Sequence, residues 1–124
     1  MSEKTILYIE DNEYNRKIVR QLLSRTSYRL IESVDGESGV AQAQQELPDL
    51  ILMDVQLPKM SGLDATRALK ADARTGHIPI IVITSFALSG DREKASAAGA
   101  NSYLAKPYSP RELLALVRQF LPEP

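Results

Sequence analysis

The stretch Leu50-Ile51-Leu52-Met53-Asp54 decides the fold, because it places a carboxylate directly after four consecutive apolar residues. A short apolar run without polar alternation is typical of a strand that is covered on both faces, as in a parallel sheet. Asp54 would then stand where the buried strand runs out into a loop. A carboxylate in such a place is costly unless it is solvated, paired, bound to a metal or used as a nucleophile.

Four further runs have the composition of buried strands, which gives five expected strands in all: Thr5–Ile9, Tyr28–Ser33, Leu50–Met53, Ile80–Thr84 and Ser102–Leu104. Between them, apolar residues recur at helical intervals, most clearly at Ile18, Val19, Leu22 and Leu23. Strands that alternate with helices of this length favour a parallel sheet built from right-handed crossovers. We therefore expect one α/β domain of (βα)5 organisation over residues 1–124, with helices on both faces of the sheet.

Boundary residues agree with this arrangement. The segment Ser109-Pro110-Arg111-Glu112 is a capping box with proline at the first helical position, and Ser61-Gly62-Leu63-Asp64 is a shorter-armed version of it. Asp35-Gly36 is typical of a turn, and Ala98-Gly99 of a helix end.

Composition limits the function classes. The chain has 124 residues, of which 44% are hydrophobic and 25% charged, and its formal net charge is −1. This balance indicates a globular domain with no bulk attraction to nucleic acid or to an anionic membrane. The sequence contains no cysteine, which excludes disulfides, thiolate catalysis and cysteine–zinc sites. No signal peptide and no membrane-spanning run is evident, so we expect a cytoplasmic protein.

Polar residues follow four of the five expected strands. They are Glu10-Asp11, Asp54, Thr84-Ser85 and Lys106. In an open parallel sheet, ligand sites form beyond the carboxyl ends of the strands, so these side chains should converge on one edge. Spacing alone leaves open that they are ordinary polar loop residues.

The chemistry of the set argues for a site. Crowded carboxylates repel one another unless a cation lies among them, and Asp11 and Asp54 offer the oxygen ligands that Mg2+ prefers. Lys106 and Thr84 could neutralise and bind the oxygens of a phosphoryl group. Phosphoryl transfer needs mainly positioning and charge neutralisation, and Asp54 could act as the nucleophile.

Four motifs together resemble the receiver domains of two-component response regulators. These are Ile9-Glu10-Asp11-Asn12, Met53 to Gly62, Ile83-Thr84-Ser85 and Lys106-Pro107, in order and over essentially the whole chain. The resemblance implies a flavodoxin-like fold with strand order 2-1-3-4-5. Asn12, Asn15 and Asp54-Val55-Gln56 look most similar to single-domain regulators of the DivK kind, and also to receivers of hybrid kinases.

The resemblance implies a role for each acidic residue. Asp54 looks like the phosphoacceptor and also a metal ligand. Asp11 looks like a direct ligand of Mg2+, with Mn2+ as an alternative. Glu10 would contribute through water, and the backbone carbonyl of Gln56 would complete the protein ligands. Lys106 resembles the lysine that binds the phosphoryl group.

The resemblance also implies a switch. Thr84 and Tyr103 look like its hydroxyl and its aromatic residue, and the peptide bond Lys106-Pro107 resembles one that is cis in the family. Many receivers have two aspartates where this chain has Glu10-Asp11, but the longer glutamate should still reach a metal-bound water. Ser85 stands where alanine is common.

Two flanking residues and the single histidine complete the expectations. Gln56 and Phe86 occupy positions that tune the dephosphorylation rate in the family. His77 is the only histidine, so the phosphoryl donor must be another protein, either a sensor histidine kinase or a histidine phosphotransfer protein.

Output would pass to a downstream protein target through the surface formed by Gly90–Ala98, Ser102–Leu104 and the last helix. The chain would be a monomer or a phosphorylation-dependent homodimer, without direct contact to nucleic acid or membrane.

Three alternative functions compete with this prediction. A magnesium phosphatase of the haloacid dehalogenase type also uses an aspartate nucleophile at a strand end, but it has a second acid where this chain has Gln56. We therefore expect no enzyme beyond its own phosphorylation and dephosphorylation. A receiver-like interaction module that is never phosphorylated stays open. A dinucleotide-binding domain is not favoured, because no G-x-G-x-x-G follows the first strand.

Overall fold

Five strands alternate with five helices along residues 3–84 and 90–123, which are the residues that the computed structural model describes. The strands are β1 (Thr5–Ile9), β2 (Arg29–Ser33), β3 (Leu50–Asp54), β4 (Ile80–Thr84) and β5 (Ser102–Ala105). The helices are α1 (Glu13–Leu23), α2 (Gly36–Glu46), α3 (Gly62–Ala71), α4 (Asp91–Ala98) and α5 (Pro110–Phe120).

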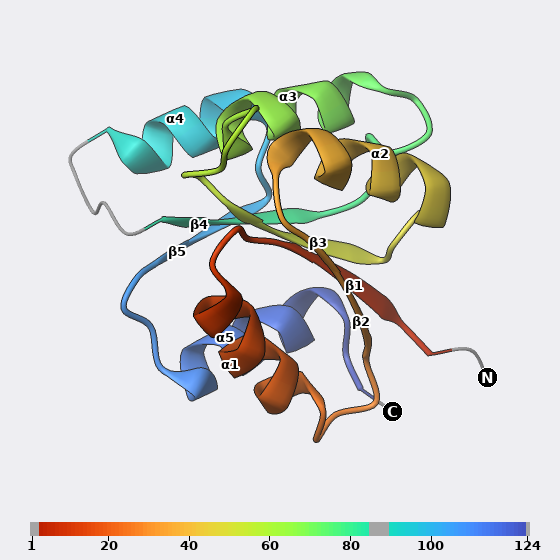
Figure 1. Cartoon of the computed structure of the whole chain (residues 1–124), viewed down its shortest axis with the longest axis vertical. Coiled ribbons are helices and arrows are strands. Elements are labelled where there is room, and N and C mark those ends of the chain that lie inside the picture. Colours follow the sequence, from red (N-terminus) through yellow and green to blue (C-terminus); the bar gives the residue numbers. More distant parts are fainter. Residues whose placement is uncertain (1–2, 85–89, 124) are drawn as a thin grey trace.

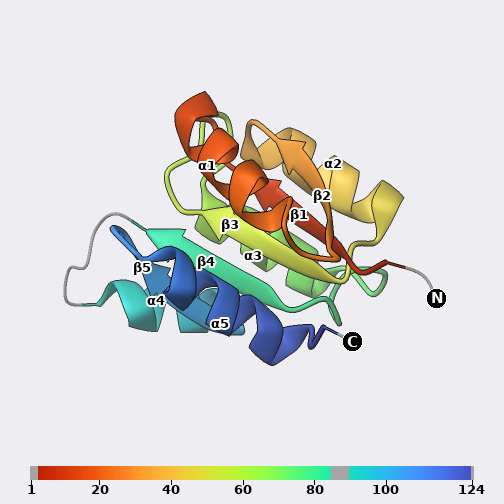
Figure 2. The same cartoon turned by 90° about the horizontal axis from the view of Figure 1, so that it is seen from below.

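All paired strands run parallel, in the order β2-β1-β3-β4-β5. Helices α1 and α5 cover one face of the sheet, and α2, α3 and α4 cover the other (Figures 1 and 2). Both the α/β class and the strand order 2-1-3-4-5 are therefore confirmed. The assignment of residues 1–124 to a single domain stays a prediction.

The core divides into two clusters, one on each face of the sheet, because successive side chains of a strand point to opposite faces. In β1, Ile6 and Tyr8 pack on the side of α1 and α5, and Leu7 and Ile9 pack on the other side. The same alternation continues through β3 and β4, whose residues are buried throughout. Burial of each large side chain stabilises the fold by about 1.5–3 kcal/mol.

Three strand boundaries differ from the prediction. Asp54 was expected just after the strand, but it is the last residue of β3, because it lies in register with Ile83 of β4. β2 begins at Arg29, since the backbone N–H of Tyr28 donates to Thr26 Oγ1 at 3.2 Å in the preceding turn. β5 ends one residue later than predicted, at Ala105, because Ala105 is paired with Thr84 of β4.

Helix boundaries largely confirm the prediction. The capping box of Ser109 and Glu112 is complete, and Gly99 ends α4 at a φ of 102°. Ser61 accepts from the backbone N–H of Asp64 at 3.1 Å, as expected, but the Asp64 carboxylate pairs with an arginine instead of reaching back.

The expectation of a turn at Asp35-Gly36 was wrong. Asp35 is the N-cap of α2, because its carboxylate accepts from the backbone N–H of Ser38 at 2.7 Å. Gly36 is then the first residue of that helix.

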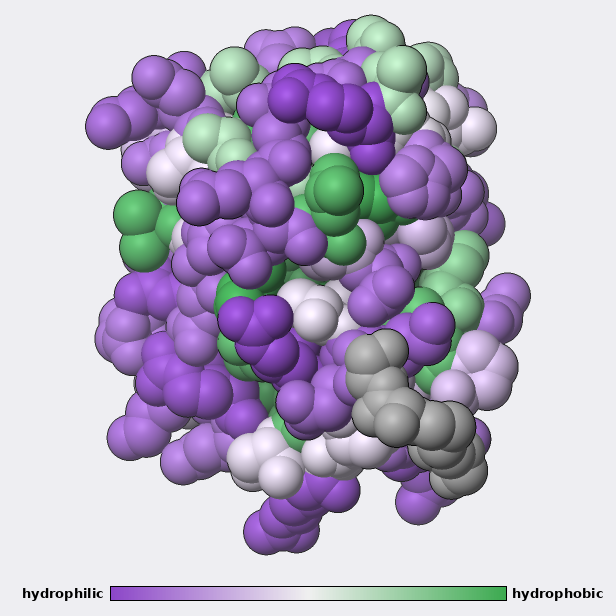
Figure 3. Space-filling model, turned by 90° about the vertical axis from the view of Figure 1, so that its right-hand side faces the viewer, coloured by the Kyte–Doolittle hydropathy of each residue, from purple (hydrophilic) through white to green (hydrophobic). Residues whose placement is uncertain are grey.

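The side of the molecule seen in Figure 3 is covered mainly by hydrophilic residues, with hydrophobic ones in small separate areas. Within residues 3–84 and 90–123, no helix has the length and apolar composition needed to span a membrane.

Candidate functional site

Three carboxylates meet where β1 and β3 end side by side. Glu10 and Asp11 follow β1, Asp54 closes β3, and each offers a carboxylate oxygen within 4.8 Å of those of the other two. Glu10 and Asp54 are only 1% and 4% exposed, whereas Asp11 faces solvent. Buried acids at such distances repel one another strongly unless positive charge or hydrogen-bond donors compensate.

The loop after β3 fits tightly against Asp54. A side chain on Gly62 would place its Cβ 1.9 Å from the backbone oxygen of Asp54, so only glycine allows the approach. The Gly62 N–H in turn donates to the Val55 carbonyl at 2.8 Å. The Gln56 backbone N–H donates to Asp54 Oδ1 at 3.0 Å, while the Gln56 side chain is exposed.

Lys106 brings the compensating positive charge. Its Nζ donates to Glu10 Oε1 and to Asp54 Oδ2, both at 3.0 Å. The backbone N–H of Lys106 donates to the Thr84 carbonyl at 2.7 Å, which ties the start of the β5–α5 loop to the end of β4. The Lys106–Pro107 peptide bond is cis, as the resemblance implied.

Glu10 has the denser set of donors. Its Oε1 accepts from the Tyr8 hydroxyl and from Asn15 Nδ2, both at 3.2 Å, in addition to Lys106. Its Oε2 accepts from the backbone N–H of Asn12 at 3.3 Å. These donors explain how a glutamate is held in a buried position where a negative charge alone would be costly.

The pKa values of the two buried acids are shifted in opposite directions. Burial and the neighbouring Glu10 raise the pKa of Asp54 to about 6, against the opposing effect of Lys106. Burial alone would raise the pKa of Glu10, but hydrogen bonding with Asp54 and Lys106 outweighs it and lowers that pKa. Asp54 is therefore the acid that a further cation would stabilise most in its ionised form.

The expected switch residues lie on β4 and β5. Thr84 is 1% exposed at the end of β4. Tyr103 is half-buried on β5, with the guanidinium carbon of Arg92 5.5 Å from its ring centroid. Ser85 and Phe86 lie outside the described residues.

Two contacts of the acidic pair were missed by sequence reasoning. Tyr8 lies within the predicted apolar strand Thr5–Ile9, and its position two residues before Glu10 points both side chains to the same side of the sheet. Arg16 was not considered, yet its Nη1 donates to the Glu10 carbonyl at 2.8 Å. No pattern along the sequence would have found this second contact.

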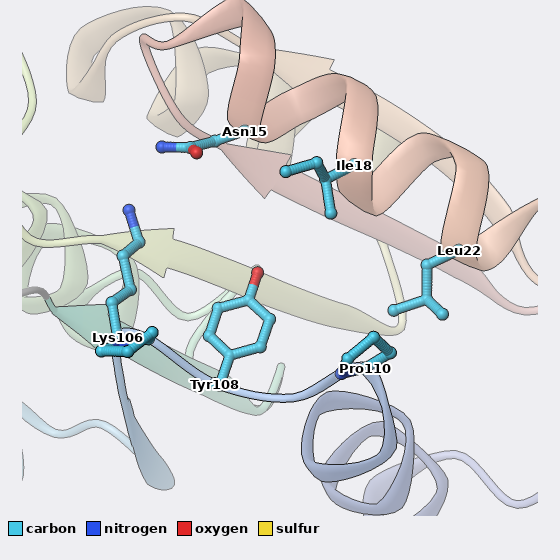
Figure 4. A pocket seen from close by; sticks show the side chains of 7 residues that line it. Asn15, Ile18, Leu22, Lys106, Tyr108 and Pro110 are labelled. Carbon is cyan, nitrogen blue, oxygen red and sulfur yellow. The ribbon is translucent and has the colours of Figure 1, made fainter.

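A pocket of about 400 Å3 opens beside Lys106, between α1 and the start of α5 (Figure 4). Ile18 and Leu22 of α1 face Tyr108 and Pro110 across it. The expected apolar stripe of α1 is thus divided, since Val19 and Leu23 are buried in the core while Ile18 is 40% exposed.

Comparison with known proteins agrees with this geometry. The family model for the response regulator receiver domain matches residues 6–118. The chain is 39% identical over 118 residues to the polar-differentiation response regulator DivK of Brucella anthropi, covering 95% of this chain and 96% of the relative.

Two solved structures extend the comparison. The receiver domain of sensor histidine kinase PA1611 from Pseudomonas aeruginosa PAO1, which has a magnesium ion coordinated in its active site cleft, is 38% identical, with a TM-score of 0.88 over 96% of this chain and 98% of that chain. The Mn2+-bound form of response regulator Rcp1 is 29% identical, with a TM-score of 0.80 over 94% of this chain and 90% of that chain. The chain therefore belongs to the response regulator receiver domain family, the receivers of two-component signalling.

Proposed function

We propose that the protein is a phosphorylation-dependent signalling switch in which Asp54 accepts a phosphoryl group from a phosphohistidine of a partner protein. The observation that carries this proposal is the buried Asp54 carboxylate, in contact with Lys106 Nζ at 3.0 Å and grouped with two more acids. An ordinary structural acid would not be surrounded by like charges that raise its pKa.

The residues fit a hard divalent cation, Mg2+ or Mn2+. Three carboxylates offer oxygens within 4.8 Å of one another, and one of these acids, Asp11, faces solvent, from which an ion could enter. Asp11 and Asp54 would bind the ion directly, Glu10 through water, and Gln56 through its backbone carbonyl. When bound, the ion supplies positive charge that lowers the repulsion between the acids and an incoming phosphoryl group.

The transfer needs little from the protein besides position and charge. An oxygen of Asp54 forms a bond to phosphorus while the phosphorus–nitrogen bond of the phosphohistidine breaks, and the electron pair returns to the imidazole of the partner. Lys106, now shared by Glu10 and Asp54, would turn to an oxygen of the transferred group. The Thr84 hydroxyl would donate to another.

Signalling follows if these contacts favour one arrangement of Thr84 and Tyr103. To shift an equilibrium from mostly inactive to mostly active takes about 5.5 kcal/mol of differential stabilisation. A doubly charged group that meets Lys106, Thr84 and the cation in one state only can approach this value. The surface of α4, β5 and α5 borders Tyr103 and would present the change to a protein target.

The protein would then be a phosphoacceptor without turnover of external substrates, in keeping with Gln56 two residues after Asp54. Its partners would be a sensor histidine kinase or a histidine phosphotransfer protein and a downstream protein. The choice between a monomer and a phosphorylation-dependent homodimer, the lack of contact with nucleic acid, and the cytoplasmic location stay predictions.

Transfer from phosphorylated histidine kinases of the source organism tests the proposal. Radiolabelled phosphate should move from one kinase or phosphotransfer protein to the wild-type chain within seconds to minutes and not to Asp54→Asn. Equal labelling of Asp54→Asn, or steady Asp54-dependent hydrolysis of a small phosphomonoester, would overturn the proposal.

A further inference from the structure

The most deeply buried polar contact of the acidic site comes from β1 itself. Tyr8 is 0% exposed, and its hydroxyl donates to Glu10 Oε1 at 3.2 Å. Tyr8 and Glu10 lie two residues apart in an extended chain, so their side chains leave the same face of the strand. The ring packs in the cluster under α1 and α5, and only the hydroxyl reaches the site.

Glu10 Oε1 therefore accepts hydrogen bonds from three donors. Asn15 Nδ2 lies at 3.2 Å and Lys106 Nζ at 3.0 Å, in addition to Tyr8. Figure 4 shows the Asn15 amide and the Lys106 amino group at the same end of the pocket. Lys106 is the only one of the three that also contacts Asp54.

We infer that Tyr8 is a positioning residue that satisfies Glu10 so that Lys106 can leave it for the phosphoryl group on Asp54. This inference rests on the proposed function of Asp54 and Lys106. With the Tyr8 hydroxyl and the Asn15 amide in place, Glu10 Oε1 keeps two donors after Lys106 turns away. Without the hydroxyl, a buried carboxylate would retain Lys106 more strongly, because charge-assisted hydrogen bonds strengthen where water is scarce.

Water cannot easily replace the lost hydroxyl. Glu10 is 1% exposed and Tyr8 is fully buried, while Tyr108 packs against the same cluster and closes it from the side of the pocket. The Tyr108 ring stands between Lys106 and Pro110 in Figure 4, with its hydroxyl pointing away from α5. A phenylalanine at position 8 would keep the ring packing and remove the hydroxyl, which is the donor to Glu10 and also interacts with the Tyr108 side chain.

The pairing also accounts for a glutamate at position 10. A side chain one methylene longer than aspartate carries the carboxylate of Glu10, just after β1, to the hydroxyl of a tyrosine two residues earlier in β1. Tyr8 and Glu10 should therefore act as a unit, and the effect of removing the hydroxyl should depend on the charge at position 10.

The test compares Tyr8→Phe with Tyr28→Phe. Tyr28 is a matched control, because it is also buried and its hydroxyl also donates to one acceptor, the Leu121 carbonyl, far from the acids. Mg2+ affinity is measured by titration calorimetry. The rate of Asp54 phosphorylation is measured at saturating Mg2+ with acetyl phosphate.

Tyr8→Phe should slow phosphorylation by about three- to tenfold, the effect of one hydrogen bond to a charged group in competition with others. The Mg2+ dissociation constant should not rise, because Glu10 keeps its charge. A merely structural role would weaken both together. Tyr28→Phe should change neither quantity, apart from stability.

A double-mutant cycle in metal-free protein supplies the second readout. Tyr8→Phe should raise the unfolding equilibrium constant in both backgrounds. The factor of increase should be about ten times smaller in the Glu10→Gln background than in the wild type, since the charged acceptor is gone. In the same background at saturating Mg2+, Tyr8→Phe should no longer slow phosphorylation.

An unchanged rate in Tyr8→Phe, or the same loss in the Glu10→Gln background, would overturn the inference and leave the proposed function intact. A wild-type chain that takes no phosphoryl group would overturn both.

Discussion

The two ends of the parallel sheet use polar side chains in opposite ways. At the amino ends, each group meets the backbone of a neighbouring element. Asp49 Oδ2 accepts from the Thr5 N–H at 2.8 Å, Asn101 Oδ1 accepts from the Ile80 N–H at 2.9 Å, and Lys70 Nζ donates to the Ile78 carbonyl at 2.7 Å. The first two contacts satisfy N–H groups at the start of β1 and β4, and the third satisfies a carbonyl in the loop before β4.

At the carboxyl ends, polar groups meet one another. Glu10, Asp11 and Asp54 crowd together, and Glu10 and Asp54 share the ammonium of Lys106. Such an arrangement costs stability in the absence of a cation, and proteins retain such costs mainly at functional sites. One end of this sheet thus fixes the fold, while the other gathers like charges, as the proposed site for a cation and a phosphoryl group requires.

Gly62→Ala should have the largest effect on the carboxyl end. A Cβ would lie 1.9 Å from the Asp54 backbone oxygen, so the loop or β3 must move. We expect the free energy of unfolding to fall by more than about 3 kcal/mol, measured by urea denaturation. Gly39→Ala is the control, since its Cβ would meet the flexible end of Ile9 at 2.5 Å, and the loss should be smaller. Equal losses would contradict the tight fit at Asp54.

Asp54→Asn should stabilise the metal-free protein at neutral pH while it abolishes phosphorylation. Removal of one charge from the acidic group relieves repulsion, and we expect the free energy of unfolding in EDTA to rise by about 1–3 kcal/mol. A loss of stability would show that Asp54 belongs with the structural groups of the opposite end.

The pH dependence of the free energy of unfolding should show the same destabilising effect of the Asp54 charge. The pKa of Asp54 is raised from 3.8 to about 6 in the folded protein, so the folded state binds the proton more tightly than the unfolded chain. The stabilisation that protonated Asp54 gives to the folded state is complete below the pKa of Asp54 in the unfolded chain. It is lost as the pH rises through the pKa of Asp54 in the folded protein. In EDTA, the free energy of unfolding should fall across this interval in the wild type more than in Asp54→Asn. Glu10, with a lowered pKa, acts with the opposite sign at lower pH.

Asn101→Ala tests the amino end. It removes the acceptor of the Ile80 N–H, and we expect the free energy of unfolding to fall by about 1 kcal/mol in thermal or urea unfolding. Mg2+ affinity and the rate of phosphorylation should stay at the wild-type values. A change in either would mean that the two ends are coupled more closely than their separate hydrogen bonds indicate.

Leu47→Gly should produce the smallest change, and in the stabilising direction. Leu47 ends α2 with a left-handed backbone at a φ of 48°, and its side chain is 51% exposed, so little packing is lost. Glycine adopts this conformation without strain, and we expect a gain of about 0.5–1 kcal/mol. Leu47→Ala keeps the strain and should bring no gain in the same unfolding measurement.

The sequence predicted the fold well because its signals were local and repeated. Apolar runs identified all five strands, and the Ser109 capping box fixed the start of α5. The boundary at Asp54 was wrong by one residue, since ladder pairing with Ile83 extends β3 and no local pattern encodes it. The residues Asp35-Gly36 suit a helix cap as well as a turn. Only the hydrogen bond from the Ser38 N–H to the Asp35 carboxylate distinguishes the two.

The site was predicted in outline but not in its contacts. Strand ends placed Glu10, Asp11, Asp54 and Lys106 at one edge, because parallel strands end together. The uneven division of donors between Glu10 and Asp54 depends on Tyr8 and Asn15, whose side-chain directions emerge only from the packed structure.

We propose that Asp54 is a phosphoacceptor that needs a divalent cation. The most direct measurement is intact mass after incubation with acetyl phosphate, with Mg2+ or with EDTA, followed by mapping of the modified residue. We expect a single added phosphoryl group, on Asp54, labile to base and formed only with Mg2+. An unmodified chain in the presence of Mg2+, or modification of another residue in its place, would contradict it.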